Sequence, residues 1–440
     1  MQNTLEVKYI TIDEVKPYVG NARTHSSQQI KQITRSIEAF GFINPILIDS
    51  NKSIVAGHGR LQAAKSLGLQ IIPCIRIDHL DDDERRAYIL ADNKLAENAE
   101  WDPDLLKIEL THLSQIEVDL DVELTGFSMP EIDIMMGSCE PVNDDPPVPD
   151  LPAAAETVVQ NGDLWSLGSH RLICGDCRDP DTVNRLMTGD QARQVFTDPP
   201  YNVPIDGHAR GLGQAIHPDF AMACGEMSSE DFTKFLAGSL EQLSSVSLEG
   251  SLHYICMDWR HMPELLSAGN SVFRELINLC IWNKSSGGMG SLYRSKHELV
   301  FIFKKGLAPH INNIELGKHG RNRANVWDYP GFNAFGQGRD EALAMHPTVK
   351  PVHMIADAIL DTSKRGEIIL DGFTGSGSTL LAVELTGRVF RGIEIDPRYI
   401  EVTLQRWINT TGEQPIQEGT GLTYAALVAS RSTQSETCEV

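Results

Sequence analysis

The 440-residue sequence predicts an α/β protein with an open, mostly parallel sheet, and two stretches of the chain carry that prediction. The first is a strand–helix–strand pattern around the glycine-rich loop 371–379. The second is an apolar strand over 194–197 that ends at Asp198-Pro199-Pro200-Tyr201. Each motif directly follows a strand, which is where open α/β sheets bind their ligands.

The glycine loop begins where the apolar run 367–370 ends, as expected after a buried parallel strand. Gly375 and Gly377 form a Gly-x-Gly, and Gly387 closes the helical stretch that follows. The next strand runs into Glu394, where an acid can accept hydrogen bonds from a ribose diol. Glycines let the backbone approach a ligand, and a helix amino terminus favours an anionic group. The pattern predicts a nucleotide-like cofactor, and its spacing leaves NAD and S-adenosylmethionine open.

The tetrapeptide Asp198-Pro199-Pro200-Tyr201 predicts chemistry on an exocyclic amino group. The two prolines stiffen the backbone, so the Asp198 carboxylate and the Pro199 carbonyl can face one point as acceptors. Two fixed acceptors would draw an adenine N6 toward tetrahedral geometry and aim its lone pair at a methyl donor. Tyr201 offers a flat face for a base extruded from the duplex. Taken alone, the four residues are equally consistent with a proline-stiffened turn.

Between about Val158 and Ile408 the chain resembles the β class of amino-group DNA methyltransferases, in which the catalytic motif precedes the cofactor loop. Besides the two motifs above, the segments 174–177, 293–301 and 346–351 carry the resemblance. It implies a Rossmann-like sheet that binds S-adenosylmethionine, needs no metal, and uses 293–301 to help form the base pocket. The cofactor-binding residues that it implies are Asp176, Lys350, Asp371, Phe373, Gly375, Gly377, Thr379 and Glu394.

Aspartate at the head of the tetrapeptide resembles the adenine-N6 group of this family, whose cytosine-N4 members usually carry serine there. The resemblance implies Asp198, Pro199, Pro200 and Tyr201 as the catalytic residues of a site-specific adenine-N6 methyltransferase. Gly372 departs from the proline common in the family, but it removes no contacting side chain, so activity is expected to be intact. Two alternatives stay open: cytosine-N4 methylation, and a regulatory DNA-binding protein with an inactive methyltransferase half.

Cysteine usage and hydropathy place the protein in the cytoplasm. Eight scattered cysteines fit free thiols in a reducing compartment, and no apolar run reaches transmembrane length. The amino terminus lacks the pattern of a signal peptide. Cys174 and Cys177 form a Cys-x-x-Cys pair, but the sequence offers no second pair to complete a four-ligand zinc site. We expect neither a metal nor a disulfide there.

The net charge of −22 is unevenly distributed, which matters for a DNA-binding protein. Residues 101–157 carry 1 basic and 14 acidic side chains, whereas residues 281–340 carry 9 basic and 4 acidic. Phosphate contacts need local positive charge rather than a basic protein. We therefore expect target recognition within 305–345, the alternative being a solvated loop with a few core aromatics. The predicted contacts to double-stranded DNA are Lys318, Arg321, Arg323 and Arg339, interleaved with Trp327, Tyr329, Phe332 and Phe335.

The first 100 residues predict a smaller α+β domain. A helix over 28–40 and strands over 46–49, 54–56 and 71–75 surround Gly57-His58-Gly59-Arg60. These residues resemble the ParB/sulfiredoxin-like nucleotide-binding domain, which implies Arg60 as a phosphate contact for a nucleotide. The signature lacks the cysteine of sulfiredoxins, so we exclude their redox activity. DNA docking and homodimer contacts remain alternative roles.

The predicted order of domains follows from these patterns. It is a ParB-like domain (1–100), a helical connection (101–140), an acidic proline-rich linker (141–157), the methyltransferase domain (158–411) and a mobile tail (412–440). The sequence leaves open the DNA recognition sequence, a restriction partner, the oligomeric state and the nucleotide of the first domain.

Overall fold

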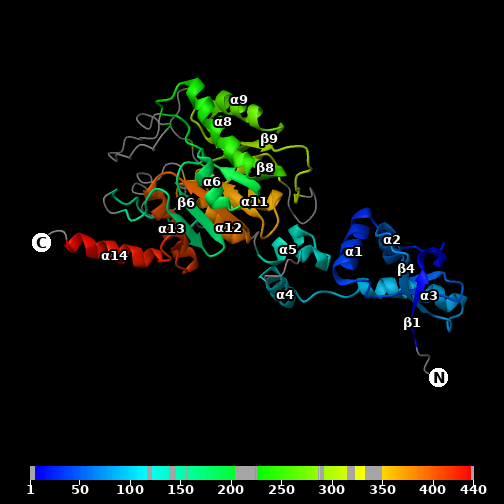
Figure 1. The fold of residues 1–440 in the computed structure, drawn as a ribbon. Coiled ribbons are helices and arrows are strands. Elements are labelled where there is room, and N and C mark those ends of the chain that lie inside the picture. The colour runs from blue at the N-terminus through cyan, green and yellow to red at the C-terminus, as the bar shows by residue number, and fades with distance from the viewer. Residues whose placement is uncertain are drawn as a thin grey trace. The chain divides into compact units, whose positions relative to one another are not determined.

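The computed structural model of the chain describes residues 5–115, 121–137, 145–154, 157–203, 223, 225–285, 287, 292–314, 323–331 and 349–437. The chain divides into two compact units, Met1–Met136 and Gly137–Val440. Figure 1 shows both units, and each is described here by itself.

The amino-terminal unit is built on a four-stranded sheet in the order β1-β4-β2-β3. Its elements are β1 (Val7–Thr11), η1 (Ile12–Glu14), α1 (Ser27–Phe40), β2 (Ile46–Ile48), β3 (Ile54–Ala56), α2 (His58–Ser66), β4 (Ile71–Arg76) and α3 (Asp82–Glu97). The three predicted strands form as β2, β3 and β4, each within one residue of its predicted bounds. Leu61 of α2 packs with Ile46, Ile48 and Ile72 of the sheet, which places the core between helix and sheet.

A second, smaller helical cluster completes this unit. It contains α4 (Pro103–Gln115), η2 (Val122–Thr125) and α5 (Met129–Met135), around Leu110, Val122 and Ile132. An ion pair between Arg35 of α1 and Asp121 joins this cluster to the first part of the unit.

The carboxy-terminal unit holds a ten-stranded sheet in the order β11-β9-β10-β8-β7-β12-β13-β6-β5-β14. The strands are β5 (Leu164–Leu167), β6 (His170–Cys174), β7 (Ala192–Thr197), β8 (Ser247–Met257), β9 (Glu275–Asn283), β10 (His297–Lys304), β11 (Val326–Asp328), β12 (Ile368–Asp371), β13 (Val389–Glu394) and β14 (Ile416–Gln417). The central strands β8, β7, β12, β13 and β6 are mutually parallel, and β10 runs antiparallel to β8 and β9. The predicted α/β class with an open, mostly parallel core is confirmed.

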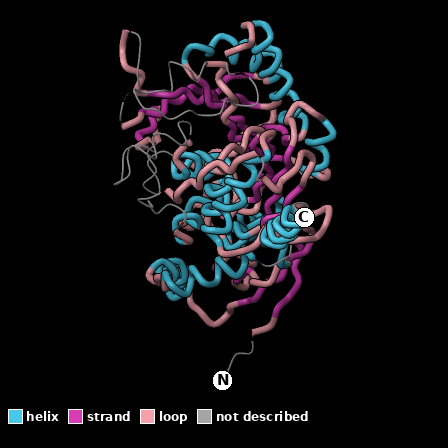
Figure 2. The backbone as a smooth tube through the Cα atoms, turned by 90° about the vertical axis from the view of Figure 1, so that its left-hand side faces the viewer, coloured by secondary structure: helices cyan, strands magenta, loops and turns pink. Residues whose placement is uncertain are grey.

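Helices cover both faces of this sheet (Figure 2). One face carries α6 (Pro180–Met187), α8 (Ser229–Ser245) and α9 (Met262–Val272), and the other carries α11 (Val352–Thr362), α12 (Ser378–Thr386) and α13 (Pro397–Thr411). Successive side chains of β8 point to opposite faces of the sheet, and both faces are apolar, so both must be covered. Tyr254 and Cys256 pack toward one helical layer, and Ile255 and Met257 pack toward the other. A short η3 (Trp259–His261) links β8 to α9.

Regular secondary structure continues after Gly412, where the sequence predicted a mobile tail. Strand β14 pairs antiparallel with β5, and α14 (Tyr424–Thr437) follows it. Glu418 accepts hydrogen bonds from the Arg171 guanidinium at 2.8 and 2.7 Å. The Tyr424 ring packs edge-on against Trp165 with a centroid distance of 5.9 Å. A few anchors therefore order a segment whose polar composition suggested a mobile chain.

The acidic linker is also more closely packed than predicted. The Asp145 carboxylate accepts a hydrogen bond of 3.1 Å from the Val352 N–H at the start of α11. The carbonyl of Pro146 accepts one of 3.3 Å from the buried Arg406 of α13. From Asp145 onward the described part of this segment therefore contacts the sheet-bearing unit.

None of the helices in the described ranges is long and apolar enough to cross a membrane.

We expect Tyr424→Ala to lower the free energy of unfolding by about 2–3 kcal/mol, because it removes a large ring packed on the core residue Trp165. Leu422→Ala is the matched control, since that side chain is 42% exposed on the same segment. Thermal or urea unfolding of the three proteins gives the comparison. Equal stability of wild type and Tyr424→Ala would contradict the structural role of the tail.

Candidate active site at the carboxyl edge of the parallel strands

The two motifs that the sequence singled out lie side by side. Strand β7 ends at Thr197 and strand β12 at Asp371, and the two strands pair directly. The Thr197 hydroxyl donates a hydrogen bond of 2.8 Å to the Asp371 carboxylate, and the Gly372 N–H donates one of 3.2 Å to the same hydroxyl. Sequence positions about 170 residues apart thus share one edge of the sheet.

The glycine loop keeps its backbone open above the sheet. Gly375 and Gly377 have φ of +53° and +83°, the left-handed region that favours glycine. A Cβ at Gly377 would lie 2.8 Å from the Thr403 side chain, so only glycine fits there. Helix α12 begins directly after Gly377, which leaves free helix N–H groups at the loop. These features form a cradle for an anionic or polar ligand.

Two buried carboxylates border this cradle. Asp371 accepts hydrogen bonds from the Phe373 N–H at 3.0 Å and from the Thr379 hydroxyl. Glu394, at the end of β13, accepts from the N–H groups of Gly375 at 2.8 Å and Asp396 at 2.9 Å. Burial raises the pKa of Asp371 to about 6 and that of Glu394 to about 7, because water no longer solvates the charged forms.

Asp176 reaches the same edge from strand β6. The Gly175 N–H donates to the Glu394 carbonyl at 2.9 Å, which brings the segment after β6 beside the end of β13. The Asp176 carboxylate pairs with Arg178 at 2.6 Å. Burial favours its neutral form, but the hydrogen bonds from Arg178 lower the pKa of Asp176 overall.

The cysteines that flank Asp176 are buried free thiols. Burial raises the pKa of both Cys174 and Cys177 to about 12. Phe373 of the glycine loop packs on Phe235 with a centroid distance of 6.0 Å, and Arg178 lies over the Phe235 ring at 5.0 Å. This packing connects the segment after β6 to the glycine loop.

The tetrapeptide forms a compact group at the end of β7. The Tyr201 hydroxyl donates to the Asp198 carboxylate at 2.6 Å, and the Lys350 ammonium pairs with the other carboxylate oxygen. Pro199 is buried and Pro200 half-buried, so the turn is fixed against the core. Burial raises the pKa of Asp198, although the charge of Lys350 acts in the opposite direction.

Asn202 follows the tetrapeptide and holds the next segment of the chain. It has φ of +51°, and its side-chain oxygen accepts from the N–H groups of Gly225 at 3.0 Å and Met227 at 3.2 Å. Its amide donates to the Met227 carbonyl at 2.9 Å. The sequence analysis assigned no role to this buried residue; asparagine directly after the motif, with its tolerance of positive φ, was the available signal.

Lys350 contacts the tetrapeptide, whereas the sequence analysis placed it beside the cofactor. Its ammonium pairs with Asp198 and also with Glu298 at 3.1 Å, and it lies over the Tyr201 ring at 5.4 Å. Glu298 begins strand β10, accepts from the Tyr201 hydroxyl at 3.2 Å, and pairs with Lys284, which follows β9. Glu298 lies within the segment 293–301 that was expected to help form the base pocket, but neither it nor Lys284 was singled out as a site residue.

The structure does not support the predicted DNA contact of Arg323. Its side chain is only 16% exposed and pairs with Asp357 at 2.8 Å and Asp361 at 3.1 Å. It also lies over the buried Trp327 at 5.4 Å, so two carboxylates and a core ring already engage its charge. The other predicted DNA contacts and rings, Lys318, Arg321, Arg339, Phe332 and Phe335, lie outside the described residues.

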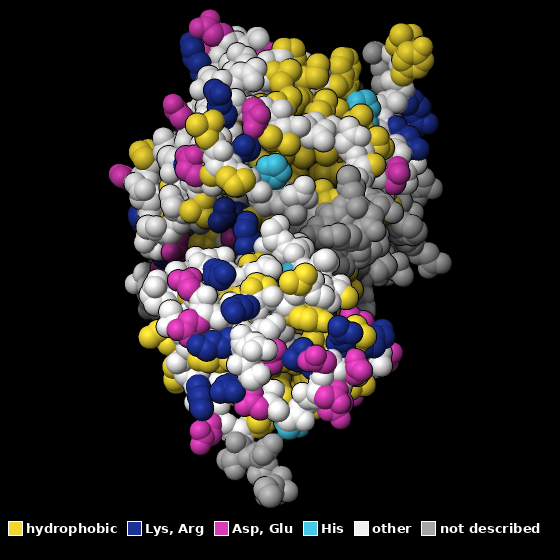
Figure 3. Space-filling model, turned by 90° about the vertical axis from the view of Figure 1, so that its right-hand side faces the viewer, with side chains coloured by type: hydrophobic (Ala, Val, Ile, Leu, Met, Phe, Trp, Pro, Cys, Tyr) yellow, Lys and Arg dark blue, Asp and Glu magenta, His cyan; other side chains and the backbone are white. Residues whose placement is uncertain are grey.

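Arg60 of the amino-terminal unit lies at the glycine-flanked start of α2, as the sequence indicated. Its guanidinium folds against Gly57 and donates to the Asn44 carbonyl at 3.1 Å. The neighbouring His58 accepts the Tyr18 N–H at 3.2 Å, and burial lowers the pKa of this imidazole. Basic and acidic side chains are interspersed on the face that Figure 3 presents.

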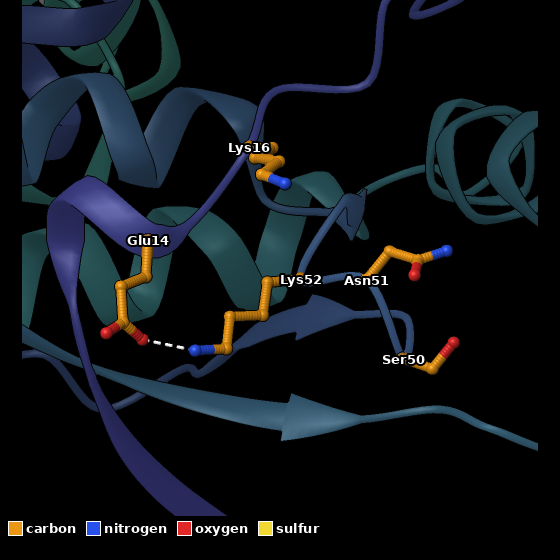
Figure 4. A pocket seen from close by; sticks show the side chains of 5 residues that line it. All are labelled: Glu14, Lys16, Ser50, Asn51 and Lys52. Carbon is orange, nitrogen blue, oxygen red and sulfur yellow. Dashed lines mark hydrogen bonds and ion pairs between the residues drawn. The ribbon is translucent and has the colours of Figure 1, made fainter.

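An open recess of about 420 Å³ lies elsewhere on this unit and is lined by Glu14, Lys16, Ser50, Asn51 and Lys52. Figure 4 shows the ion pair between Glu14 and Lys52 across it. Arg60 is not among the lining residues.

The fold and the site together define an α/β enzyme with a glycine-loop cradle beside an acidic tetrapeptide, the class of the amino-group methyltransferases. A family model described as DNA methylase matches residues 192–405. A ParB N-terminal domain matches residues 1–94, and a ParB-methyltransferase HTH domain matches residues 104–160. Residues 192–405 thus match the DNA methylase family, and the chain carries an amino-terminal ParB domain.

Individual relatives agree with this division of the chain. Over 86 residues the chain is 42% identical to the ParB-like nuclease domain-containing protein YnaK of Escherichia coli, covering 20% of this chain and 99% of that protein. It is 26% identical over 238 residues to the type II methyltransferase M2.DpnII of Streptococcus pneumoniae, covering 50% of this chain and 84% of the relative. It is 27% identical over 237 residues to the DNA adenine methyltransferase YhdJ of E. coli, covering 48% of this chain and 74% of the relative.

We expect Gly377→Ala to destabilise the protein by about 1–3 kcal/mol and to weaken cofactor binding, because the new Cβ meets Thr403 at a positive φ. Gly238→Ala is the control: this glycine lies in the interior of α8, with nothing within 4 Å of an added Cβ. Gly238→Ala should leave the free energy of unfolding unchanged or raise it by up to about 1 kcal/mol. Thermal or urea unfolding measures the stability of both variants, and titration measures their affinity for the cofactor. Equal stability and equal affinity in the two variants would refute the role of the glycine loop as a ligand cradle.

Glu394 should make the stability of the cofactor-free protein depend on pH. Its pKa in the folded protein is about 7 against an ordinary 4.5, so the folded state binds the proton more tightly than the unfolded chain. That contribution is fully present below the ordinary pKa and is lost as pH rises through the folded value. We expect Glu394→Gln to flatten the fall of Tm between about pH 5 and pH 8. Parallel Tm profiles of wild type and variant would show that Glu394 does not titrate in this way.

Proposed function

We propose that this protein transfers the methyl group of S-adenosylmethionine to the N6 amine of an adenine flipped out of double-stranded DNA, at a specific sequence. The observation that carries the proposal is the pairing of β7 with β12, which places Asp198 beside the glycine loop. An acceptor for an amine and a cradle for a methyl donor thus lie at adjacent strand ends, as a direct transfer between them requires.

The residues around the glycine loop fit S-adenosylmethionine. Gly375 and Gly377 leave the backbone accessible, and Glu394 at the end of the next strand suits a ribose diol. Asp176 follows β6, which pairs with β13, and we assign it to contact the adenine of the cofactor. When bound, S-adenosylmethionine supplies an electrophilic methyl group on a sulfonium sulfur. The match to the DNA methylase family favours this cofactor over NAD.

The tetrapeptide would hold and orient the target amine. Asp198 and the Pro199 carbonyl accept its two N–H bonds, which directs the nitrogen lone pair out of the plane of the base. The Tyr201 hydroxyl donates its proton to Asp198 at 2.6 Å, with Glu298 as a second, more distant acceptor at 3.2 Å, and this fixes the orientation of its ring as a stacking surface. Positioning and electrostatics are the whole contribution of these groups, and no covalent bond to the enzyme forms.

Adenine N6 is preferred over cytosine N4 on two grounds. Aspartate heads the tetrapeptide, where N4 enzymes of this family usually carry serine, and one relative is described as a DNA adenine methyltransferase. Cytosine N4 also presents an amine beside a ring nitrogen, so the same geometry could hold it. The identity of the modified base distinguishes the two.

We expect Asp198→Ala to lower methyl transfer by at least about 10²-fold, because the fixed acceptor for the amine is lost. Purified protein, unmethylated DNA and labelled S-adenosylmethionine are incubated, and the labelled nucleoside is identified after digestion. Asp190→Asn is the matched control, a carboxylate that precedes the same strand at its opposite end and pairs with Arg391 at 3.0 Å. Label on N4-methylcytosine would overturn the substrate, and cofactor binding without any transfer would favour a regulatory DNA-binding role.

A further inference from the structure

We propose that Glu298 is a positioning residue that takes over the Lys350 ammonium when the target amine binds Asp198, and so frees that carboxylate for its substrate. The inference rests on the proposed function, which it deepens by naming the groups that prepare the amine-binding carboxylate.

Four charged groups from separate parts of the chain meet at the tetrapeptide. Asp198 follows β7, Glu298 begins β10, Lys284 follows β9 and Lys350 precedes α11. Because β9 runs antiparallel to β10 and β10 antiparallel to β8, the end of β9 and the start of β10 lie at the edge where β7 ends. Two carboxylates and two ammonium groups sum to zero charge, which permits their burial together.

Lys350 bridges the two carboxylates. It pairs with one oxygen of Asp198 and lies 3.1 Å from Glu298 Oε2. The other Asp198 oxygen accepts from Tyr201 at 2.6 Å, so both oxygens of the proposed amine acceptor already have a donor. Lys350 is 5% exposed, and a buried ion pair is much stronger than one in water. A carboxylate oxygen has a second lone pair, so an amine can still reach Asp198, but it must share the carboxylate with the Lys350 ammonium.

Glu298 makes that exchange possible. A buried ammonium that lost its only carboxylate would be left unpaired, which is strongly unfavourable. With Glu298 already in contact, Lys350 can shift its hydrogen bonds toward Glu298 and remain compensated. The amine then gains the Asp198 lone pairs that Lys350 gives up.

Lys284 keeps Glu298 ready for this role. It pairs with Glu298 Oε1, leaving Oε2 for Lys350 and Tyr201, and its ammonium lies over the Trp282 ring at 4.6 Å. Burial alone would favour a neutral Glu298, but Lys350 and Lys284 lower the pKa of this carboxyl to about 2. Glu298 is therefore ionised at neutral pH.

The first test compares Glu298→Gln with wild type in methylation of a DNA duplex. We expect kcat to fall about 10²-fold with the KM for the cofactor unchanged, because Asp198 is then the one carboxylate partner that the described residues give Lys350. Glu275→Gln is the matched control, since Glu275 and Lys304 form a 3.1 Å pair between the same strands β9 and β10. Equal kcat for wild type and Glu298→Gln would overturn the proposal.

A second variant separates positioning from a structural role. In the Lys350→Met background Glu298 has no ammonium to share with Asp198, and its charge only repels that carboxylate. Glu298→Gln should then leave the rate unchanged or raise it, although it lowers the rate when Lys350 is present. A merely structural Glu298 would cause the same fold loss in both backgrounds, and that result would reject the inference.

The pH profile provides a third readout. Among the described residues, the groups that face Asp198 are Lys350, Glu298, Tyr201, Cys256 on β8 and Asp371 on β12. The Glu298 charge raises the pKa of Asp198, so Glu298→Gln should move the acidic limb of kcat/KM to lower pH. An unshifted limb would count against the inference. If wild type itself transfers no methyl group to DNA, the proposed function fails, and that outcome is distinct from an active wild type with an unaffected Glu298→Gln variant.

Discussion

The pairing of β7 with β12 is the constraint on which the rest of the site depends. It is secured at its end by a buried hydrogen bond between the Thr197 hydroxyl and Asp371, which also holds the first N–H of the glycine loop. Desolvation opposes an ionised Asp371 there, and donors from Thr197, Thr379 and the Phe373 N–H offset the cost. Once these two strand ends are fixed, other strands add functional groups to the same edge: Glu394 from β13, which pairs with β12, and Glu298 from β10, which pairs with β8.

Helix α11 connects two clusters of ion pairs, one around Arg323 and one around Lys350. Asp357 and Asp361 on this helix bind Arg323, while Lys350 just before the helix reaches Asp198 and Glu298. The Arg323 cluster lies against the core ring Trp327 and fixes the helix to the sheet. A helix held in this way presents Lys350 at a defined place, so a structural cluster determines the geometry of a functional one. Both follow the same rule that a buried charge requires a partner.

The sequence allowed the strand ends, the glycine loop and the tetrapeptide to be predicted because their residue types carry local conformational information. Gly377 needs a positive φ, and prolines after Asp198 fix a turn, so a short window suffices. Glu298 could not be assigned in this way, since its partners Tyr201, Lys284 and Lys350 are set by strand order. Arg323 was misread because charge in a basic stretch does not reveal the carboxylates that meet it. The contacts of Tyr424 and Glu418 in the tail could not be predicted either, because their partners Trp165 and Arg171 are distant in sequence.

The acidity of the connecting segment is explained in part by internal pairing. Residues 101–157 carry 14 acidic side chains and a single basic one, a balance that repels DNA phosphates. Asp121 pairs with Arg35 of α1, and Asp145 accepts the Val352 N–H at the amino end of α11, where a carboxylate also favours the helix dipole. These acids hold elements within each unit. Two of the acidic side chains in this segment, Asp121 and Asp145, therefore serve internal packing.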